Sequence, residues 1–412
     1  MVSQWMLQPL LLPLAFLAAP SASFAGSGAA SSSFPEPSGG CAARAKAVPR
    51  EGLSRHSISV HDPLLSHGFR RYALYIPASY DGTSSVPLVL DFHGFYDDFV
   101  SEAKEDGMRL AAEREGFIVA YPNGKGDNPA DPDDWWNTWN AAGTNGTPGR
   151  FGPEICTKDH SLYPCYSSCA IAGLCDGKKK HRTDCGSATC VDDTGFMRAL
   201  MLHLKQSFCI DESRIHGTGI STGGIFLYAM AADPVVGPQL ASIMPVEASE
   251  ILGYLAGPVQ SMAVIDVHGS KDDCIPANVT NSWGPYKHNG CPNSRAGRDG
   301  CTVGDDGWFY HPVDEVLATY AASNGCPSER PQPQPQAVTS RFDGQTGWSC
   351  TAPFGSCSVA PVLRCVHSGG HTWPFHVGKP QIRNRQFGEM FWHFVGQIRR
   401  SKPSETMPDL II

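Results

Sequence analysis

The sequence predicts an α/β fold in which one mostly parallel sheet carries helices on both faces. Short β-prone apolar runs alternate along the chain with segments of helical periodicity. Several of these runs are apolar throughout, as expected of strands buried on both faces. Such alternation is typical of a parallel sheet between two helical layers. The predicted strands are 72–77, 87–92, 117–121, 214–220, 242–246, 263–268 and 362–367, and the predicted helices are 103–115, 193–208, 222–232, 313–323 and 383–399.

The bulk composition is that of a globular, loop-rich enzyme. Hydrophobic residues make up 41% of the 412-residue chain and charged residues 17%, with 43 glycines and 33 prolines. These values disfavour a disordered chain or a coiled coil. The formal net charge of −8 disfavours a protein that tracks nucleic-acid phosphates. We therefore expect a folded enzyme that binds no nucleic acid.

The N-terminus has the features of a secretory signal peptide over residues 1–25. Its apolar run from Leu10 to Ala19 is too short to span a bilayer and is followed by small residues. The 15 cysteines favour an oxidising compartment, and glycosylation sequons begin at Asn145 and Asn278. The sequence thus predicts a secreted, extracellular glycoprotein with disulfides and no membrane span after signal cleavage. An odd cysteine count leaves one thiol unpaired, and Cys41 is the candidate.

Composition also divides the rest of the chain. Residues 26–56 are rich in Ser, Gly and Pro and indicate a linker, residues 57–402 carry the alternating pattern of a catalytic domain, and residues 403–412 form a C-terminal tail. Within the domain, residues 141–190 hold six cysteines and show little periodicity, which predicts a disulfide-rich insertion. The cysteine spacing matches no zinc template, so we expect neither a metal nor a cofactor.

Ser221 is the candidate nucleophile. A β-prone run enters the sequence Gly219-Ile220-Ser221-Thr222-Gly223, and an apolar helical pattern follows. This is the context of a nucleophile elbow, in which a sharp strand-to-helix turn exposes the serine hydroxyl above the sheet of an α/β-hydrolase fold. A plain turn residue is the alternative. The predicted strand and helix on either side of Ser221 favour its interpretation as a nucleophile more strongly than the short GxSxG motif alone.

A serine hydroxyl needs an imidazole to take its proton and a carboxylate to orient that imidazole. His371 follows the last predicted strand on a glycine-rich loop, and His376 is its local rival. Asp272 follows the predicted strand 263–268, with Asp273 and Asp266 as alternatives. The order Ser, Asp, His along the chain is that of the α/β-hydrolases.

Two backbone N–H groups are the expected donors of an oxyanion hole. One belongs to Phe95, which follows the pair His93-Gly94 at the end of an early strand, and the other to Thr222, which follows the nucleophile. His93 itself is expected to pack beneath this loop rather than to react.

Several tryptophans are candidate substrate contacts. Trp135, Trp136 and Trp139 cluster before the insertion, and Trp373 lies two residues after the candidate base. Aromatic rings can stack on sugars or on an aromatic acyl group, but they also bury large areas in any core. We expect Trp135, Trp136 and Trp373 to contact the substrate, with a core role as the open alternative.

Six motifs together resemble a known family. They are LVLDFHG at 88–94, YPNG at 121–124, VDDTGF at 191–196, GISTGG at 219–224, HGSKDDCIP at 268–276 and GGHTWP at 369–374. They are similar to segments of the secreted esterases grouped with polyhydroxybutyrate depolymerases, feruloyl esterases and acetylxylan esterases. The resemblance spans roughly Tyr72 to Val395.

This resemblance implies a nucleophile at Ser221, an acid at Asp272 and a base at His371. It also implies a disulfide from Cys326 to the region of Cys350. The implied function is that of a secreted serine carboxylic-ester hydrolase that acts through an acyl-enzyme on feruloyl or acetyl esters of polysaccharides. A polyester depolymerase is the alternative among enzymes, and a catalytically silent hydrolase-fold binding protein is the alternative from another class.

Overall fold

The computed structural model describes residues 37–41, 52–65, 68–126, 137–141, 166–172, 189–252, 259–278, 302–304, 308–375 and 385–400. All of these belong to one compact unit, residues 35–412. The predicted signal peptide, most of the predicted linker and the predicted C-terminal tail lie outside the described residues.

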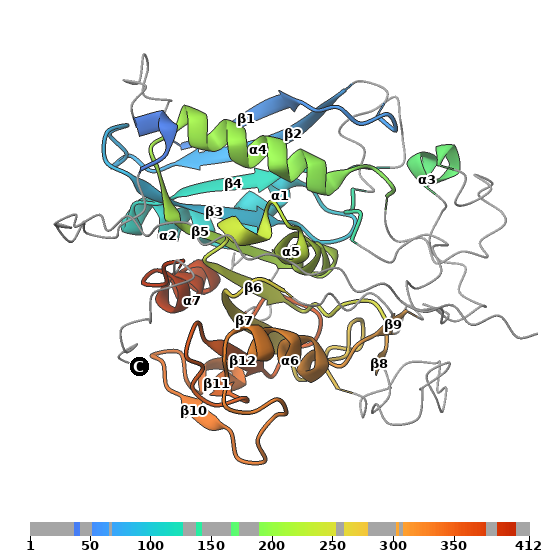
Figure 1. The fold of residues 1–412 in the computed structure, drawn as a ribbon, viewed down its shortest axis with the longest axis vertical. Helices are drawn as coiled ribbons and strands as arrows, with labels where there is room; N and C mark the ends of the chain where they lie inside the picture. The colour runs from blue at the N-terminus through green and yellow to red at the C-terminus, as the bar shows by residue number, and fades with distance from the viewer. Residues whose placement is uncertain are drawn as a thin grey trace, which may run out of the picture. The chain divides into compact units, whose positions relative to one another are not determined.

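One ten-stranded sheet organises this unit (Figure 1). Its strands are β1 (Gly52–Ser59), β2 (Phe69–Ile76), β3 (Val86–Phe92), β4 (Ile118–Pro122), β5 (Ile210–Ile220), β6 (Ser242–Val246), β7 (Ala263–Gly269), β10 (Gln336–Val338), β11 (Ser349–Ala352) and β12 (Val362–His367). Their order is β1-β2-β4-β3-β5-β6-β7-β12-β11-β10. The pairs from β4 through to β12 in this order are parallel, and the outer pairs are antiparallel.

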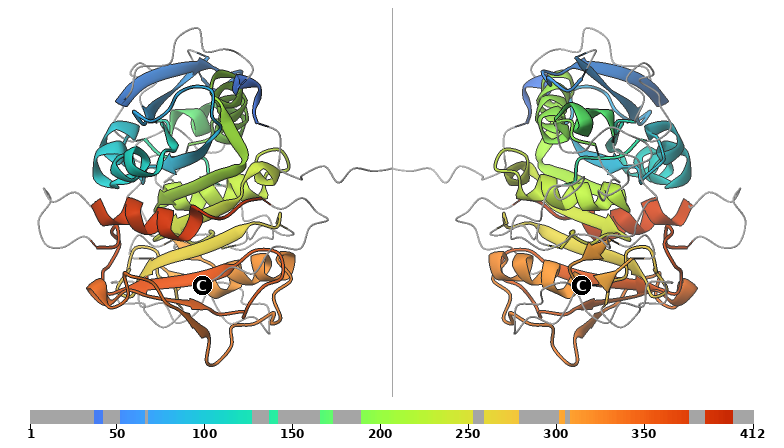
Figure 2. Two further views of the ribbon diagram at one scale, coloured as in Figure 1. Left: turned by 90° about the vertical axis from the view of Figure 1, so that its left-hand side faces the viewer. Right: turned by 90° about the vertical axis from the view of Figure 1, so that its right-hand side faces the viewer.

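Helices cover both faces of the sheet. They are η1 (Gly39–Cys41), α1 (Phe99–Glu105), α2 (Met108–Glu115), α3 (Ser167–Ile171), α4 (Asp193–Ser207), α5 (Thr222–Ala232), η2 (Gly237–Gln239), α6 (Val313–Ser323), η3 (Gln345–Gly347) and α7 (Arg385–Val395), and a small hairpin joins β8 (Thr302–Val303) and β9 (Phe309–Tyr310). Apolar side chains of α4, α5 and α6 form one core with one face, and those of α1, α2 and α7 form a second core with the other. Figure 2 shows the sheet between these two layers. The α/β fold with a mostly parallel sheet is therefore confirmed.

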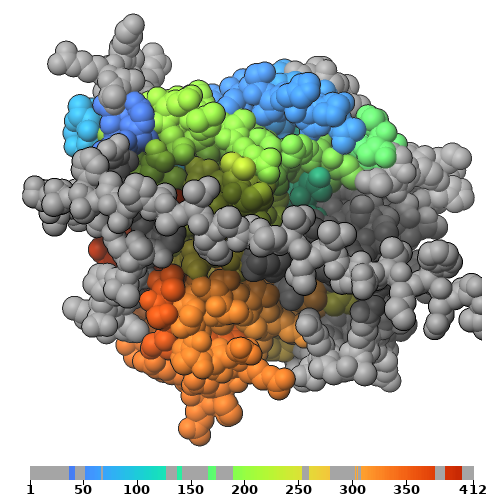
Figure 3. Space-filling model, viewed as in Figure 1, coloured from blue at the N-terminus to red at the C-terminus, as the bar shows by residue number. Residues whose placement is uncertain are grey.

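The apolar periodicity does not reveal the antiparallel strands at the two edges. β1 pairs with β2 along its full length, although its first residues fall in the predicted linker. β10 begins at the end of the proline-rich run 331–336. Edge strands that face solvent carry few apolar residues, so they leave no continuous hydrophobic run. In Figure 3 the segments that carry these two edges, blue and orange, lie at opposite ends of the visible face.

The predicted helix 103–115 is two helices in the structure. Asp98 caps α1 by accepting hydrogen bonds from the N–H groups of Val100 and Ser101, so that this helix begins before the predicted start. Gly107 adopts a φ of 76° between α1 and α2, a conformation that favours glycine and interrupts the helix. Among the described residues, no helix combines the length and apolar character needed to cross a bilayer.

Four disulfides join described residues, and one of them corrects the prediction that Cys41 is unpaired. They are Cys41–Cys209, Cys169–Cys190, Cys326–Cys357 and Cys350–Cys365. The segment around Cys41 pairs with the start of β5, where Ser38 N–H donates to the Ile210 carbonyl oxygen at 3.1 Å. This contact brings Cys41 against Cys209, which a linker composition does not predict.

The expected pairing of Cys326 with the region of Cys350 is also refined. Cys326 pairs with Cys357, while Cys350 on β11 lies opposite Cys365 on β12 and bonds to it. The antiparallel register of β11 and β12 decides this pairing. Cys169–Cys190 confirms a disulfide within the predicted insertion 141–190.

Candidate active site

Ser221 occupies the sharp turn between β5 and α5. Its backbone has φ 56° and ψ −125°, a strained conformation for a residue other than glycine. The turn is closed because Ser221 N–H donates to the Val246 carbonyl oxygen at 2.9 Å and its own carbonyl oxygen accepts from Ile225 N–H. The Ser221 side chain is half-buried, so the turn presents the hydroxyl at the carboxyl end of the parallel strands.

The glycine two residues later lets the helix approach the sheet. A Cβ atom on Gly223 would lie 2.4 Å from the carbonyl oxygen of Phe92 and 2.5 Å from that of His93. Both obstacles are backbone atoms at the end of β3, so they cannot move aside cheaply. The GxSxG spacing is therefore a packing requirement of this turn.

Asp272 and His371 meet across the ends of two adjacent strands. Asp272 follows β7 and His371 follows β12, and His371 Nδ1 lies 2.9 Å from Asp272 Oδ2. The two loops also bond to each other, since Ser270 N–H donates to the His367 carbonyl oxygen and Lys271 N–H to that of Gly369. The fold thus places a carboxylate behind an imidazole that is 22% exposed.

The Asp272 carboxylate is buried but accepts several hydrogen bonds from protein groups. Burial alone would raise its pKa, but hydrogen bonding and charge from His371, a hydrogen bond with Glu247 and the charge of His268 lower the pKa to about 2. Its other oxygen accepts from the N–H groups of Cys274 and Ile275, each at 2.9 Å. Asp272 is therefore ionised at neutral pH, and His371 carries its proton on Nδ1.

The structure distinguishes Asp272 from its sequence rivals. Asp273 is exposed, whereas Asp266 is buried on β7 beside His268 Nδ1 at 3.4 Å. Among these three acids, Asp272 is the one whose carboxylate accepts from His371. The rival base His376 lies outside the described residues.

The loop that follows β3 lies directly beside Ser221. A Cβ atom built on Gly94 would lie 3.5 Å from Ser221 Cβ. His93 is fully buried beneath this loop, accepts from Gly124 N–H through Nε2 and contacts the Gly94 carbonyl oxygen through Nδ1. Burial lowers the pKa of His93 to about 4, so it is a neutral packing residue, as expected. Phe95 and Thr222, the predicted oxyanion donors, line the same pocket as Ser221.

A pocket of about 370 Å³ opens over Ser221 and His371. Trp373 lines it, although this side chain is 7% exposed and packs on Phe387, with ring centroids 4.3 Å apart. Trp139 also lines the pocket from the core. The predicted contacts Trp135 and Trp136 lie outside the described residues.

Two pocket carboxylates were not predicted from the sequence. Asp97 and Glu105 line the same pocket as Ser221, on the loop after β3 and at the end of α1. Burial raises the pKa of Asp97 to about 6, with a smaller contribution from the charge of Glu105. In the sequence both lie in an acidic, polar stretch, which gives no sign that they face the site.

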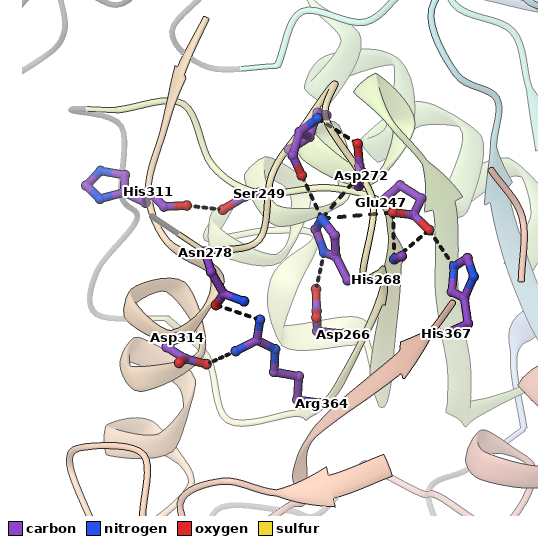
Figure 4. A network of polar contacts seen from close by, with 12 residues as sticks. Glu247, Ser249, Asp266, His268, Asp272, Asn278, His311, Asp314, Arg364 and His367 are labelled. Atoms are coloured by element: carbon purple, nitrogen blue, oxygen red, sulfur yellow. Dashed lines mark hydrogen bonds and ion pairs between the residues drawn. The ribbon is translucent and has the colours of Figure 1, made fainter. Parts of the chain in front are cut away.

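A buried polar network lies next to Asp272 and is not evident from the sequence (Figure 4). It joins Glu247, which follows β6, to His268 on β7 and His367 on β12. Neighbouring strands bring these residues together, so no local spacing could have shown it.

Two groups of described residues have ligand atoms close enough to hold a metal ion. One is Glu247, His268 and Asp272, and the other is Asp91, Glu102 and Asp106. In the first group the side chains already form hydrogen bonds with protein groups. In the second, burial raises the pKa of each carboxyl group, and repulsion from Asp106 raises those of Asp91 and Glu102 further, which favours shared protons.

The topology and the elbow together define an α/β-hydrolase fold. The Ser221 turn follows a central strand of the parallel part of the sheet, and Asp272 and His371 follow two later strands, in the chain order Ser, Asp, His.

Known proteins with similar sequences are esterases. The chain is 23% identical over 180 residues to a probable feruloyl esterase C of Aspergillus niger, covering 44% of this chain and 50% of that protein. It is 24% identical over 190 residues to a probable feruloyl esterase C of Aspergillus terreus, covering 46% and 54%. The chain thus matches about half the length of these curated relatives. No protein-family model matches it.

Solved structures are similar at lower identity. An acetyl xylan esterase from Aspergillus awamori has a TM-score of 0.44 and 13% identity, covering 83% of this chain and 99% of that chain. The native structure of sOPH has a TM-score of 0.42 and 16% identity, covering 89% and 93%. These sequence relatives are named as probable feruloyl esterases, and the sheet order and the Ser221 turn are those of an α/β-hydrolase fold.

Proposed function

We propose that this protein is a serine carboxylic-ester hydrolase with Ser221 as nucleophile, His371 as general base and Asp272 as the acid that orients it. The observation that carries the proposal is the 2.9 Å contact between His371 Nδ1 and Asp272 Oδ2, together with the pocket that His371 and Ser221 both line. Because Asp272 accepts the Nδ1 proton, Nε2 of His371 is the nitrogen left to take a proton from serine.

The proposed reaction has two halves. Ser221 attacks the ester carbonyl while His371 takes its proton, and the backbone N–H groups of Phe95 and Thr222 stabilise the oxyanion. His371 then returns the proton to the leaving alcohol, which leaves an acyl-enzyme. A water molecule attacks this intermediate by the same route and releases the acid.

We propose feruloyl or acetyl esters of polysaccharides as substrates. The pocket volume of about 370 Å³ falls in the range of small-molecule sites and suits a small acyl group. Asp97 and Glu105 add carboxylate acceptors beside Ser221. Sugar hydroxyls can donate to such acceptors, whereas the backbone of a polyester offers no donor. The names of the sequence relatives agree with this substrate class.

We also propose that the protein works outside the cell. Four disulfides among the described residues support an oxidising environment, and so does the predicted signal peptide.

The first experiment compares the secreted protein with Ser221→Ala on a nitrophenyl acetate, methyl ferulate, acetylated xylan and a polyhydroxybutyrate film. We expect turnover of the ferulate or the xylan, lost by at least about 10³-fold in the variant. Clearing of the film alone would favour the polyester depolymerase. A fluorophosphonate should label the wild type and not the variant. Absence of both turnover and label in folded wild type would instead support a silent binding protein.

A further inference from the structure

Glu247 lies where three strands of the sheet end together. It directly follows β6, with a φ of 48°, and its N–H donates to the Val267 carbonyl oxygen at 2.9 Å. Both of its carboxyl oxygens lie 2.9 Å from the N–H nitrogen of Gly269, the last residue of β7. Its Oε1 lies 2.6 Å from Nε2 of His367, the last residue of β12. One side chain therefore holds the starting points of two loops: the acid loop after β7, which carries Asp272, and the base loop after β12, which carries His371.

The hydrogen-bond partners of His367 fix the direction of its contact with Glu247. His367 Nδ1 accepts from Gly369 N–H at 3.1 Å, so the ring proton is on Nε2 and is donated to Glu247 Oε1. Burial lowers the pKa of His367 to about 4, so the ring is neutral at neutral pH. His367 therefore supplies a hydrogen bond to Glu247 but no positive charge.

The charges around Glu247 disfavour ionisation of its carboxyl group beside the carboxylate of Asp272. Its side chain is fully buried. A carboxyl oxygen of Glu247 lies within 4.8 Å of a carboxyl oxygen of Asp272 and of a ring nitrogen of His268. Asp266 also faces this cluster from β7, where Oδ1 lies 3.4 Å from His268 Nδ1. Among the described residues of this network, His268 is the side chain able to offset these carboxylates, and it is shared with Asp266 and Asp272. Two carboxyl groups in such a place hold one proton between them.

We propose that Glu247 keeps this proton and, as a neutral carboxyl group, is a positioning residue that donates a hydrogen bond to Asp272 and ties the acid loop to the base loop. This inference rests on the proposed function of Asp272 and His371. Burial and the neighbouring Asp272 raise the pKa of Glu247, and the pKa of Asp272 is lowered, in agreement with this division of the proton. Figure 4 shows Glu247 between these groups.

Two substitutions test this role by activity. Glu247→Gln replaces a neutral carboxyl with an amide that still has one donor and one acceptor, so kcat and the acid limb of the pH profile should match the wild type. Loss of a buried charge beside the imidazole would instead move that limb to lower pH by about one unit, and would overturn the proposal. Glu247→Leu should lower kcat by about 10- to 100-fold with little change in KM, because the two loops lose their common anchor. Wild-type kcat in Glu247→Leu would also overturn it.

An infrared measurement tests the proton without any activity. The difference between wild type and Glu247→Gln at pH 7 should show the C=O stretch of a protonated carboxylic acid in the wild type. Loss of a carboxylate band instead would overturn the inference. The exposed Glu115→Gln is the control and should remove a carboxylate band. If the protonated band is present but the wild type hydrolyses no ester, the proposed function fails while the protonation of Glu247 stands.

Discussion

Asp272 shows how neighbours decide the charge of a buried residue. Its folded pKa of about 2 lies below the value of about 3.9 expected in the unfolded chain. Because the folded pKa is depressed, its ionisation stabilises the fold above about pH 4, and this contribution is lost as pH falls toward 2. Asp272 thus stays charged over the pH range in which an imidazole base works.

The acid limb of the pH–rate profile should accordingly report protonation of His371 and not of Asp272. We expect kcat/KM to fall in acid and to show no further inflection from Asp272 above about pH 3. Asp272→Asn should lower kcat by about 10⁴-fold while the protein remains folded, because the imidazole loses its acceptor. Asp273→Asn, a matched change at the exposed neighbour, should leave kcat near wild type. The reverse result would reassign the acid.

The pocket carboxylates should affect sugar esters more than simple esters. Asp97→Asn and Glu105→Gln replace charged acceptors by neutral ones and should raise KM for acetylated xylan by several-fold, since a hydrogen bond to a charged group is worth about 1 kcal/mol more than one to a neutral group. KM for nitrophenyl acetate, which has no hydroxyl donor, should change little. Equal effects on both substrates would show that these residues act on the pocket as a whole. The comparison needs initial rates on both esters above pH 6, where Asp97 is ionised.

The start of α5 packs tightly against the end of β3. This contact sets the height of the Ser221 turn above the sheet, because the N-terminal turn of α5 rests on two carbonyl groups of the early loop. The helix interior is apolar on all sides and buried, so α5 cannot shift outward to relieve a clash.

A methyl group at this contact should therefore disturb the turn. Gly223→Ala places a Cβ atom 2.4 Å from the Phe92 carbonyl oxygen, and we expect a lower thermal midpoint and a loss of kcat. Gly39→Ala adds the same methyl where no heavy atom lies within 4 Å, and should leave both quantities unchanged. Calorimetry and ester hydrolysis measure the two effects. A Gly223→Ala protein with wild-type midpoint and kcat would contradict the packing argument.

At the scale of the whole molecule, disulfides connect parts of the chain that are distant in sequence. Cys41–Cys209 joins residues separated by 168 positions, whereas Cys326–Cys357 spans 31. Cross-links that close longer loops restrict the unfolded chain more strongly. Replacing the first pair by serines should thus cost more stability than replacing the second, by about 1.5 kcal/mol on loop-closure entropy alone. Denaturant unfolding without reductant measures the difference, and a reversed order would contradict this account.

A second property of the whole molecule is the cost of burying acids. Asp91, Glu102 and Asp106 are buried together, burial raises the pKa of each, and repulsion from Asp106 raises those of Asp91 and Glu102 further. The folded state therefore binds protons that the unfolded state releases above about pH 4, so this cluster lowers stability as pH rises. Asp91→Asn should raise the thermal midpoint at pH 8 more than at pH 4. An equal shift at both pH values would contradict the assignment.

Local patterns predicted the centre of the fold well. The predicted strands 242–246 and 362–367 and the predicted helices 222–232 and 313–323 match the observed bounds, because buried elements carry continuous or periodic apolar residues. β1, β10 and β11 escaped since they are short or exposed edge strands whose pairing depends on a neighbour. The break between α1 and α2 occurs at Gly107, which adopts a left-handed backbone. A glycine can adopt this conformation but does not have to, so the sequence alone did not predict the break.

The same division holds for the site. Residue chemistry and chain order selected Ser221, Asp272 and His371 as candidates, because each follows a recognisable strand and parallel strands end at one edge of the sheet. The partners Glu247 and His367, and the pairing of Cys41 with Cys209, were accessible only through the folded sheet. Strand order is a long-range property: it depends on which surfaces bury each other best, and no local spacing records which strand ends become neighbours.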